Sequence, residues 1–102
     1  MSGDQLALDA LFQASGVGKL HLFRHYLYFC SESEGADAAE QLQRMGYTTE
    51  EIPEADGSWL VRATHEVRPT SDGVSLLRQA MERLANRFGG EYDGWEAETR
   101  ST

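Results

Sequence analysis

"HLFRHYLYFC", residues 21–30, alternates in the manner of a β-strand and is rich in aromatic side chains. Phe23, Leu27 and Phe29 share one parity, whereas Tyr26 and Tyr28 share the other. Successive side chains of a strand point to opposite faces of the sheet, so the first set should face a core. The stretch therefore predicts a strand with at least one well-buried face, which the segments on either side must pair with and cover.

A short helix is expected before this strand. Residues 4–14, "DQLALDALFQA", place Leu8, Leu11 and Phe12 at helical spacing, and the glycines that follow are stop signals.

A second helix is expected directly after the strand, over residues 31–46. Ser31 is a candidate N-cap, and Glu34 follows it at the spacing of a capping box. Gly46 can adopt the left-handed conformation that ends a helix. The face predicted to be buried is narrow and contains small residues, and it repeats every third position: Ala39, Leu42 and Met45.

A hairpin is expected next. "YTTEEIP", residues 47–53, has β-branched and aromatic residues and ends in proline, which is typical of an edge strand. Asp56-Gly57 supplies a tight turn into "SWLVRATHEV", residues 58–67. One parity of this second strand contains Trp59, Val61, Ala63, His65 and Val67.

The longest periodic segment follows Pro69, with Thr70 or Ser71 as its cap. Its apolar positions have the spacing of a core-facing helix: Val74, Leu77, Met81, Leu84 and Phe88. Gly89 and Gly90 end it, and "EYDGWEAE", residues 91–98, has room for a final strand before a polar tail.

The resulting order is β-α-β-β-α-β after an N-terminal helix, which predicts an α+β, ferredoxin-like sandwich with both later helices on one sheet face. We expect an N-terminal helix and linker over residues 1–20, the domain over 21–97 and a frayed tail over 98–102. The other sheet face should present Tyr26, Tyr28, Arg62 and Thr64. Water, a partner or the N-terminal helix must meet them, and we expect the two tyrosines to pack beneath that helix.

Length and composition indicate one soluble domain, because the chain has 102 residues, of which 40% are hydrophobic and 25% charged. A formal charge of -8 repels nucleic-acid phosphates, so we expect no direct nucleic-acid binding. The lone Cys30 is typical of a reducing compartment, and no apolar run is long enough to span a bilayer. A cytoplasmic protein without a membrane segment is expected.

The histidines His21, His25 and His65 raise the question of a metal or catalytic site. No CxxC, no HxH and no HxxxH on a helix is present, because the histidines fall on predicted strands. We therefore expect surface or half-buried histidines, no metal, no cofactor and no catalytic residue. An enzyme that binds a small molecule or a metal through His65 and Asp93 is the alternative.

Acidic residues crowd the second predicted helix and the hairpin after it. A solvated face explains them, and a docking surface for a basic protein segment is the second interpretation. They are Glu32, Glu34, Asp37, Glu40, Glu50, Glu51, Glu54 and Asp56.

"GGEYDGWE", residues 89–96, combines a helix stop with a strand entry. Gly89 and Gly90 can adopt positive φ, and Asp93-Gly94 can bulge the strand so that Tyr92 and Trp95 both bury aromatic area. The alternative is that Asp93, Trp95 and Glu96 contact a partner at an exposed sheet end.

The segment "EYDGW", residues 91–95, resembles the closing motif of the regulator of ribonuclease E activity B (RraB) family. The likeness extends over about residues 5–97 and includes "HYLYF", the helix end "MGY" and "WLVRATHEV". The resemblance implies a non-enzymatic inhibitor that binds the bacterial ribonuclease E through its non-catalytic scaffold region and so modulates RNA turnover. A self-associating scaffold, such as a homodimer through the open sheet face, is the remaining alternative.

Overall fold

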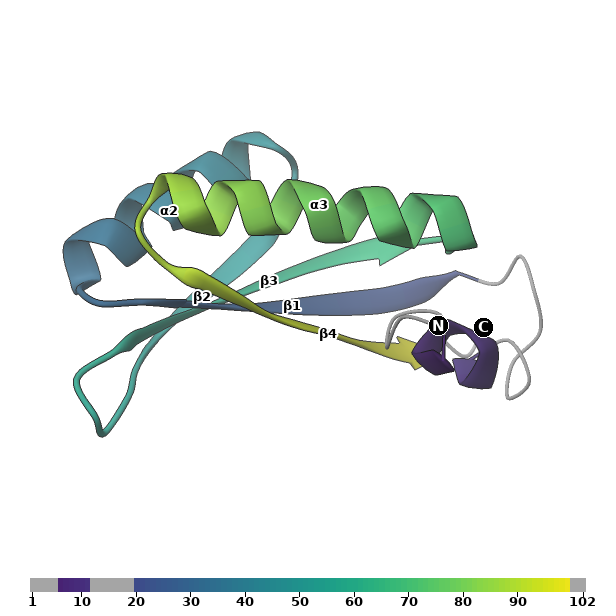
Figure 1. The fold of residues 1–102 in the computed structure, drawn as a ribbon, viewed down its shortest axis with the longest axis horizontal. Coiled ribbons are helices and arrows are strands. Elements are labelled where there is room, and N and C mark those ends of the chain that lie inside the picture. Colours follow the sequence, from purple (N-terminus) through teal and green to yellow (C-terminus); the bar gives the residue numbers. More distant parts are fainter. Residues whose placement is uncertain (1–5, 12–19, 100–102) are drawn as a thin grey trace.

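The computed structural model describes residues 6–11 and 20–99. Residues 6–11 are helical, and the elements that follow have the predicted β-α-β-β-α-β order (Figure 1). Phe12, the glycines expected to stop the first helix and the end of the predicted tail, residues 100–102, lie outside the described residues. The elements are β1 (His21–Phe29), α2 (Glu32–Arg44), β2 (Thr48–Pro53), β3 (Trp59–Val67), α3 (Ser71–Arg87) and β4 (Glu91–Thr99).

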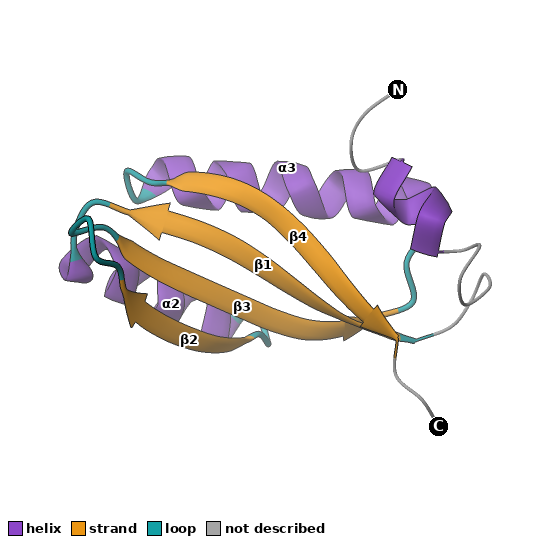
Figure 2. Ribbon diagram, turned by 90° about the horizontal axis from the view of Figure 1, so that it is seen from below, coloured by secondary structure: helices purple, strands orange, loops and turns teal. Residues whose placement is uncertain are grey.

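The strands form one four-stranded antiparallel sheet in the order β2-β3-β1-β4. Both α2 and α3 cover the same face of this sheet, as predicted (Figure 1). Figure 2 views the sheet from the opposite side, where the described elements leave it uncovered. The predicted edge position of β2 is confirmed, and β4 extends to Thr99, two residues past the expected domain end at 97.

The core lies between the sheet and the helices. Every second residue of β1 is buried, starting with His21 and ending with Phe29. The larger apolar cluster joins β1 and β3 to both helices, through Leu27, Phe29, Ala38, Ala39, Leu42, Val61, Ala63, Met81, Leu84 and Ala85.

A smaller apolar cluster unites Leu8, Phe23 and Val74, with Trp95 packed against it. The helical residues 6–11 therefore contact the helix-covered side of the sheet, and the prediction that they cover Tyr26 and Tyr28 is wrong for this segment. The physical reason is that Leu8 finds apolar partners there, whereas the uncovered face carries ion pairs.

Both helices begin at side-chain caps. The Oγ of Ser31 accepts a hydrogen bond from the backbone N–H of Glu34 at 3.3 Å. Thr70, one of the two predicted candidates, caps α3 by accepting from the N–H of Gly73 at 2.9 Å. Gly46 has a φ of 99°, the left-handed conformation expected after α2.

Met45 differs from the prediction, because 48% of its side chain is exposed. Helix α2 ends at Arg44, and the N–H of Tyr47 bonds back to the carbonyl of Leu42 at 3.0 Å. That turn carries the chain toward β2 before Met45 reaches the core. The buried stripe of α2 instead extends toward the start of the helix and includes Gly35 and Ala38.

The loop between β2 and β3 is the predicted tight turn. Asp56 Oδ1 accepts from the N–H of Ser58 at 2.9 Å and from its hydroxyl at 2.6 Å. These bonds lower the pKa of Asp56, since they favour its charged form. Gly57 supplies the positive φ of 91°.

Candidate functional site

The motif at residues 89–96 places its glycines where backbone geometry requires them. Gly89 ends α3 with a φ of 77°, as predicted. Gly90 does not adopt positive φ, which corrects the prediction for this residue. A Cβ at Gly90 would instead overlap the ring of Phe29 and the carbonyl oxygen of Tyr28. Gly90 therefore permits close approach of the α3–β4 connection to the end of β1.

The predicted bulge in β4 is confirmed. Tyr26 pairs with Gly94 and Leu27 with Tyr92, so Asp93 is the extra residue. Gly94 follows it with a φ of 109°. In a regular strand Tyr92 and Trp95 would point to opposite faces, whereas the bulge turns both toward the helices. The motif therefore supplies two aromatic side chains to one face.

Trp95 and Tyr92 have different surroundings on that face. The ring of Trp95 stacks on Phe23, with centroids 4.7 Å apart and an interplanar angle of 18°. The hydroxyl of Tyr92 lies 2.8 Å from His25 Nδ1, and the guanidinium of Arg78 stands 5.2 Å from the centre of the Tyr92 ring. Both aromatics are half-buried, which agrees with the structural interpretation of the motif.

A buried polar cluster, formed by His25, His65 and Tyr92, lies within the core. His25 Nε2 is 2.9 Å from His65 Nε2. His21 and His25 are fully buried, so the expectation of surface or half-buried histidines is wrong for these two residues. The alternation of β1 could have predicted this burial, because His21 and His25 have the same parity as the core residues Phe23 and Leu27.

Burial lowers the pKa of His65 to about 4, which makes the neutral imidazole the stable form in the fold. The ring centroid of Tyr47 lies 4.4 Å from that of His65, and burial raises the pKa of Tyr47. Within the cluster, His25 links the neutral imidazole of His65 to the hydroxyl of Tyr92. Within residues 6–11 and 20–99, no group of three or more His, Cys, Asp or Glu residues could hold a metal ion.

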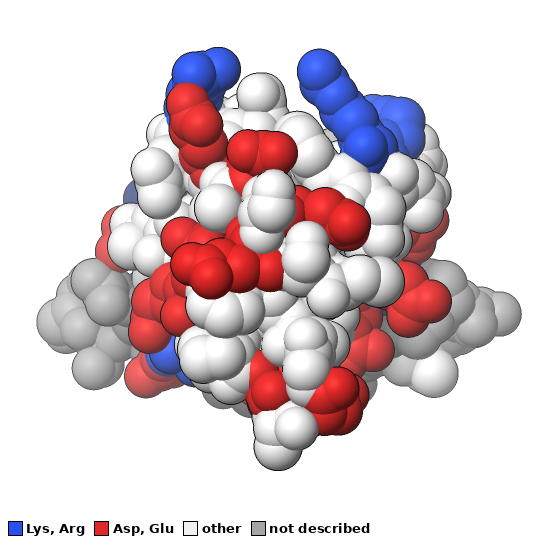
Figure 3. Space-filling view, turned by 90° about the vertical axis from the view of Figure 1, so that its left-hand side faces the viewer, with Lys and Arg blue, Asp and Glu red and all other residues white. Residues whose placement is uncertain are grey.

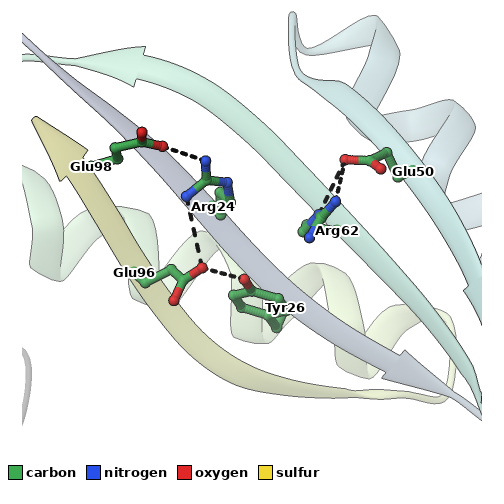
Figure 4. Close-up of polar contacts among 6 residues, drawn as sticks. All are labelled: Arg24, Tyr26, Glu50, Arg62, Glu96 and Glu98. Carbon is green, nitrogen blue, oxygen red and sulfur yellow. Dashed lines mark hydrogen bonds and ion pairs between the residues drawn. The ribbon is translucent and has the colours of Figure 1, made fainter. Parts of the chain in front are cut away.

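The uncovered sheet face is polar, and Figure 4 shows its main contacts. Arg24 bonds to Glu98 and lies 3.8 Å from Glu96, whose carboxylate also accepts from the Tyr26 hydroxyl. That bond to Glu96 is the first cause of the raised pKa of Tyr26. Tyr26 therefore points away from the helices, as predicted.

A second ion pair on this face joins β3 to the edge strand. Arg62 donates to Glu50 through Nη2 at 2.7 Å and through Nε at 3.1 Å. These bonds raise the pKa of Arg62. Tyr28 is half-buried between buried Leu27 and Phe29, and half-buried Thr64 pairs with Arg24 across the sheet, which agrees with their predicted place on this face.

Carboxylates gather at one end of the molecule, which Figure 3 faces directly. The acids placed at this acidic end are Glu32, Glu34, Glu51, Glu54, Asp56 and Glu91. The start of α2, the β2–β3 hairpin and the start of β4 meet there. Glu34 lies beside Gly89, Glu51 accepts from the Trp59 indole at 3.1 Å, and Ser58 and Glu91 line one small cavity. The sequence did not predict that Glu91 joins these acids, because it is far from them along the chain.

The structure separates the residues predicted to contact a partner. Glu32 and Glu34 lie at the acidic end, Asp37 is exposed farther along α2, and Glu40 pairs with Arg44 at 2.6 Å. Asp93 is exposed in the bulge. Trp95 faces the core, whereas Glu96 lies on the uncovered face. Trp95 and Glu96 therefore do not form one contiguous surface with the acids of α2.

No helix within the described ranges is long and apolar enough to cross a membrane. A comparison with curated proteins finds no match. The model of the RraB family, described as "Regulator of ribonuclease activity B", matches residues 7–97. This match runs from the N-terminal helix through the buried polar cluster and the bulge into β4. The chain belongs to the regulator of ribonuclease activity B (RraB) family.

Proposed function

We propose that this protein is a non-enzymatic regulator that binds ribonuclease E through the basic, non-catalytic region of that enzyme and inhibits it. Such binding would modulate RNA turnover in the cytoplasm of a bacterium. Family membership supports a regulator of a ribonuclease, and the acidic end supports a basic partner. We also propose a ferredoxin-like sandwich over residues 21–97, which the element order and the sheet order β2-β3-β1-β4 support.

The observation that carries the proposal is the convergence of carboxylates from three separate segments. Most basic side chains visible in Figure 3 stand along its upper margin, while carboxylates occupy the middle and lower parts. An extended arginine-rich segment could pair with several carboxylates at once, and the charge complementarity would speed association. RNA would be repelled by the same surface.

The proposed contacts are the acids of the acidic end together with Asp37, Glu40 and Asp93. Trp95 and Glu96 contribute indirectly, since one packs on Phe23 and the other pairs with Arg24. No cofactor or metal takes part.

Capture of a purified ribonuclease E scaffold fragment tests the proposal. Binding is expected at low salt and should weaken as salt rises, because exposed charges are screened. The variant Glu32→Gln, Glu34→Gln, Glu91→Gln should weaken capture about tenfold and reduce inhibition of RNA cleavage by the same enzyme. Absence of capture at low salt would contradict the proposal.

A matched control removes the same charge elsewhere. Glu66→Gln, Glu82→Gln, Glu98→Gln leaves the acidic end intact and should capture the fragment nearly as well as the parent. Equal loss in both variants would mean that net charge, not the acidic end, governs binding. Sedimentation of the chain alone tests the alternative of a homodimer through the uncovered sheet face.

A further inference from the structure

A groove separates α2 from α3 on the outer side of the helix layer. It encloses about 320 Å³ and is lined by Gln41, Met45, Ala80, Arg83, Leu84, Arg87 and Phe88. Leu84 is buried, Phe88 is half-buried and Met45 is 48% exposed. The groove therefore has an apolar floor and an exposed apolar margin.

The apolar character continues along α3 beyond the groove. Leu76 lies one turn before Ala80 on the same side of the helix, and 64% of it is exposed. At about 1.5 Å of rise per residue, the stripe from Leu76 to Phe88 is about 18 Å long. That length matches about three turns of a docked helix, and a helix in a groove is a common form of peptide recognition.

Arginines that lack carboxylate partners stand at this groove. Arg24, Arg44, Arg62 and Arg78 each pair with a glutamate. Among the residues that the structure describes, Arg83 and Arg87 have no carboxylate within ion-pair distance. The guanidinium of Arg87 lies 5.6 Å from the centre of the Phe88 ring. An acidic protein thus places uncompensated positive charge beside an exposed apolar stripe.

We propose that this groove binds an acidic, amphipathic helix of a partner protein. Apolar side chains of that helix would contact Met45, Leu84 and Phe88, while its carboxylates would pair with Arg83 and Arg87. A second copy of the chain is disfavoured because each copy carries a formal charge of -8. The same charge disfavours RNA. This surface differs from the acidic end in position and in the charge that it selects, so it goes beyond the proposed function.

Fluorescence anisotropy with a labelled synthetic peptide tests the groove. The probe is a helix about four turns long, with leucines along one face and glutamates elsewhere. We expect saturable binding to the full chain. Peptides with the glutamates changed to lysine, or the leucines to alanine, should bind at least about tenfold more weakly.

The protein variants separate the groove from general charge. Arg83→Gln, Arg87→Gln should weaken peptide binding about tenfold, and Arg83→Lys, Arg87→Lys should restore most of it, since lysine keeps the charge near the helix end. Arg24→Gln, Arg62→Gln removes equal charge from the opposite face and should leave binding unchanged. Melting temperatures of all three variants establish that each is folded.

Several outcomes would overturn the groove proposal. Equal weakening by the two glutamine variants would show that net charge governs binding. Equally tight binding of the lysine peptide would show the wrong selectivity. Displacement of the bound peptide by single-stranded RNA would assign the groove to RNA. If the peptide does not bind and Arg83→Gln, Arg87→Gln abolishes self-association of the chain, the groove is instead an interface between two copies. Arg83→Gln, Arg87→Gln should still capture the ribonuclease E fragment, because its acidic end is intact. This capture separates a failure of the groove proposal from a failure of the proposed function.

Discussion

Two glycines, Gly46 after α2 and Gly90 between α3 and β4, are required for different physical reasons. Gly46 has a φ of 99° with nothing near a prospective Cβ, whereas Gly90 lacks positive φ but has backbone and ring atoms in the way. A larger residue at position 46 would therefore strain the backbone, whereas a larger residue at position 90 would overlap packed atoms.

Gly90→Ala should therefore lower the free energy of unfolding by about 3 kcal/mol, because a rigid backbone oxygen and a buried ring must both move. Gly46→Ala should lower it by only about 1 kcal/mol, the usual cost of an L-residue in left-handed geometry. Urea denaturation of both variants measures the difference. An equal effect in the two variants would show that the contact at Gly90 is readily relieved.

Acid should destabilise the fold through the buried polar cluster. The pKa of His65 is depressed from 6.5 to about 4 by burial, so the unfolded chain binds more protons between these values. Stability is therefore fully present above about pH 6.5 and is lost as pH falls toward 4. Protonating His65 would place a positive charge in a half-buried position, 2.9 Å from His25 Nε2 and beside the ring of Tyr47.

Thermal unfolding between pH 7.5 and about pH 4 measures this loss. His65→Gln retains a group that can hydrogen-bond to His25 but does not titrate, so its melting temperature should fall less across the same range. A parent and variant with identical pH profiles would assign the acid sensitivity to other groups.

At the scale of a whole element, the bulge in β4 fixes which side chains reach the core. Asp93 has no partner position on β1, while Glu96 pairs with Arg24 in the regular part of the strand. Deletion of the extra residue Asp93 would leave the core-facing side chains of β4 on the same face, whereas deletion of Glu96 would turn the residues on one side of it to the opposite face.

Deletion of Asp93 should be tolerated at a cost of about 1–2 kcal/mol, because Tyr92 and Trp95 still face the helices in the resulting regular strand. Deletion of Glu96 should cost more than about 4 kcal/mol, since it turns one end of β4 inside out. Circular dichroism during thermal unfolding distinguishes the two. Equal destabilisation would mean that the bulge is itself essential for packing.

The whole molecule is polarised, with carboxylates concentrated at one end. Like charges held together by the fold repel one another, and salt reduces that repulsion. Ion pairs on the uncovered face are exposed and few among the described residues, so their weakening by salt should matter less.

Raising sodium chloride from about 0.02 M to about 0.5 M should therefore raise the melting temperature by about 2–4 °C. Glu32→Gln, Glu34→Gln, Glu91→Gln should show a smaller rise, because the repulsion has already been relieved. Differential scanning calorimetry measures both. A fall in the melting temperature with salt would indicate that attractive pairs dominate.

Local signals predicted the elements well. The alternation in residues 21–30, the cap residues before each helix and the Asp93-Gly94 pair act over a few residues, so they are legible along the chain. The buried contact between His25 and His65 joins strands that are 40 positions apart. Motifs of fixed spacing do not detect such a pair. The position of each histidine within its strand, on the core-facing parity, would have predicted it.

The candidate site was harder to predict for the same reason. Acids on α2 and in the hairpin form a dense run in the sequence, but Glu91 joins them only through folding. Trp95 and Asp93 are near neighbours in the motif, yet the bulge sends Trp95 toward Phe23 and leaves Asp93 exposed. The groove between α2 and α3 depends on the geometry of two packed helices, which periodicity alone does not give.

The central place of β1 has a consequence for biosynthesis. Residues 21–29 pair with β3 on one side and with residues 91–99 on the other. A nascent chain that has left the ribosome only as far as α3 would expose one edge of β1 and the buried side chains that β4 later covers. Because non-local strand pairing is slow and exposed edges invite aggregation, the emerging chain should fold cooperatively only once β4 is free.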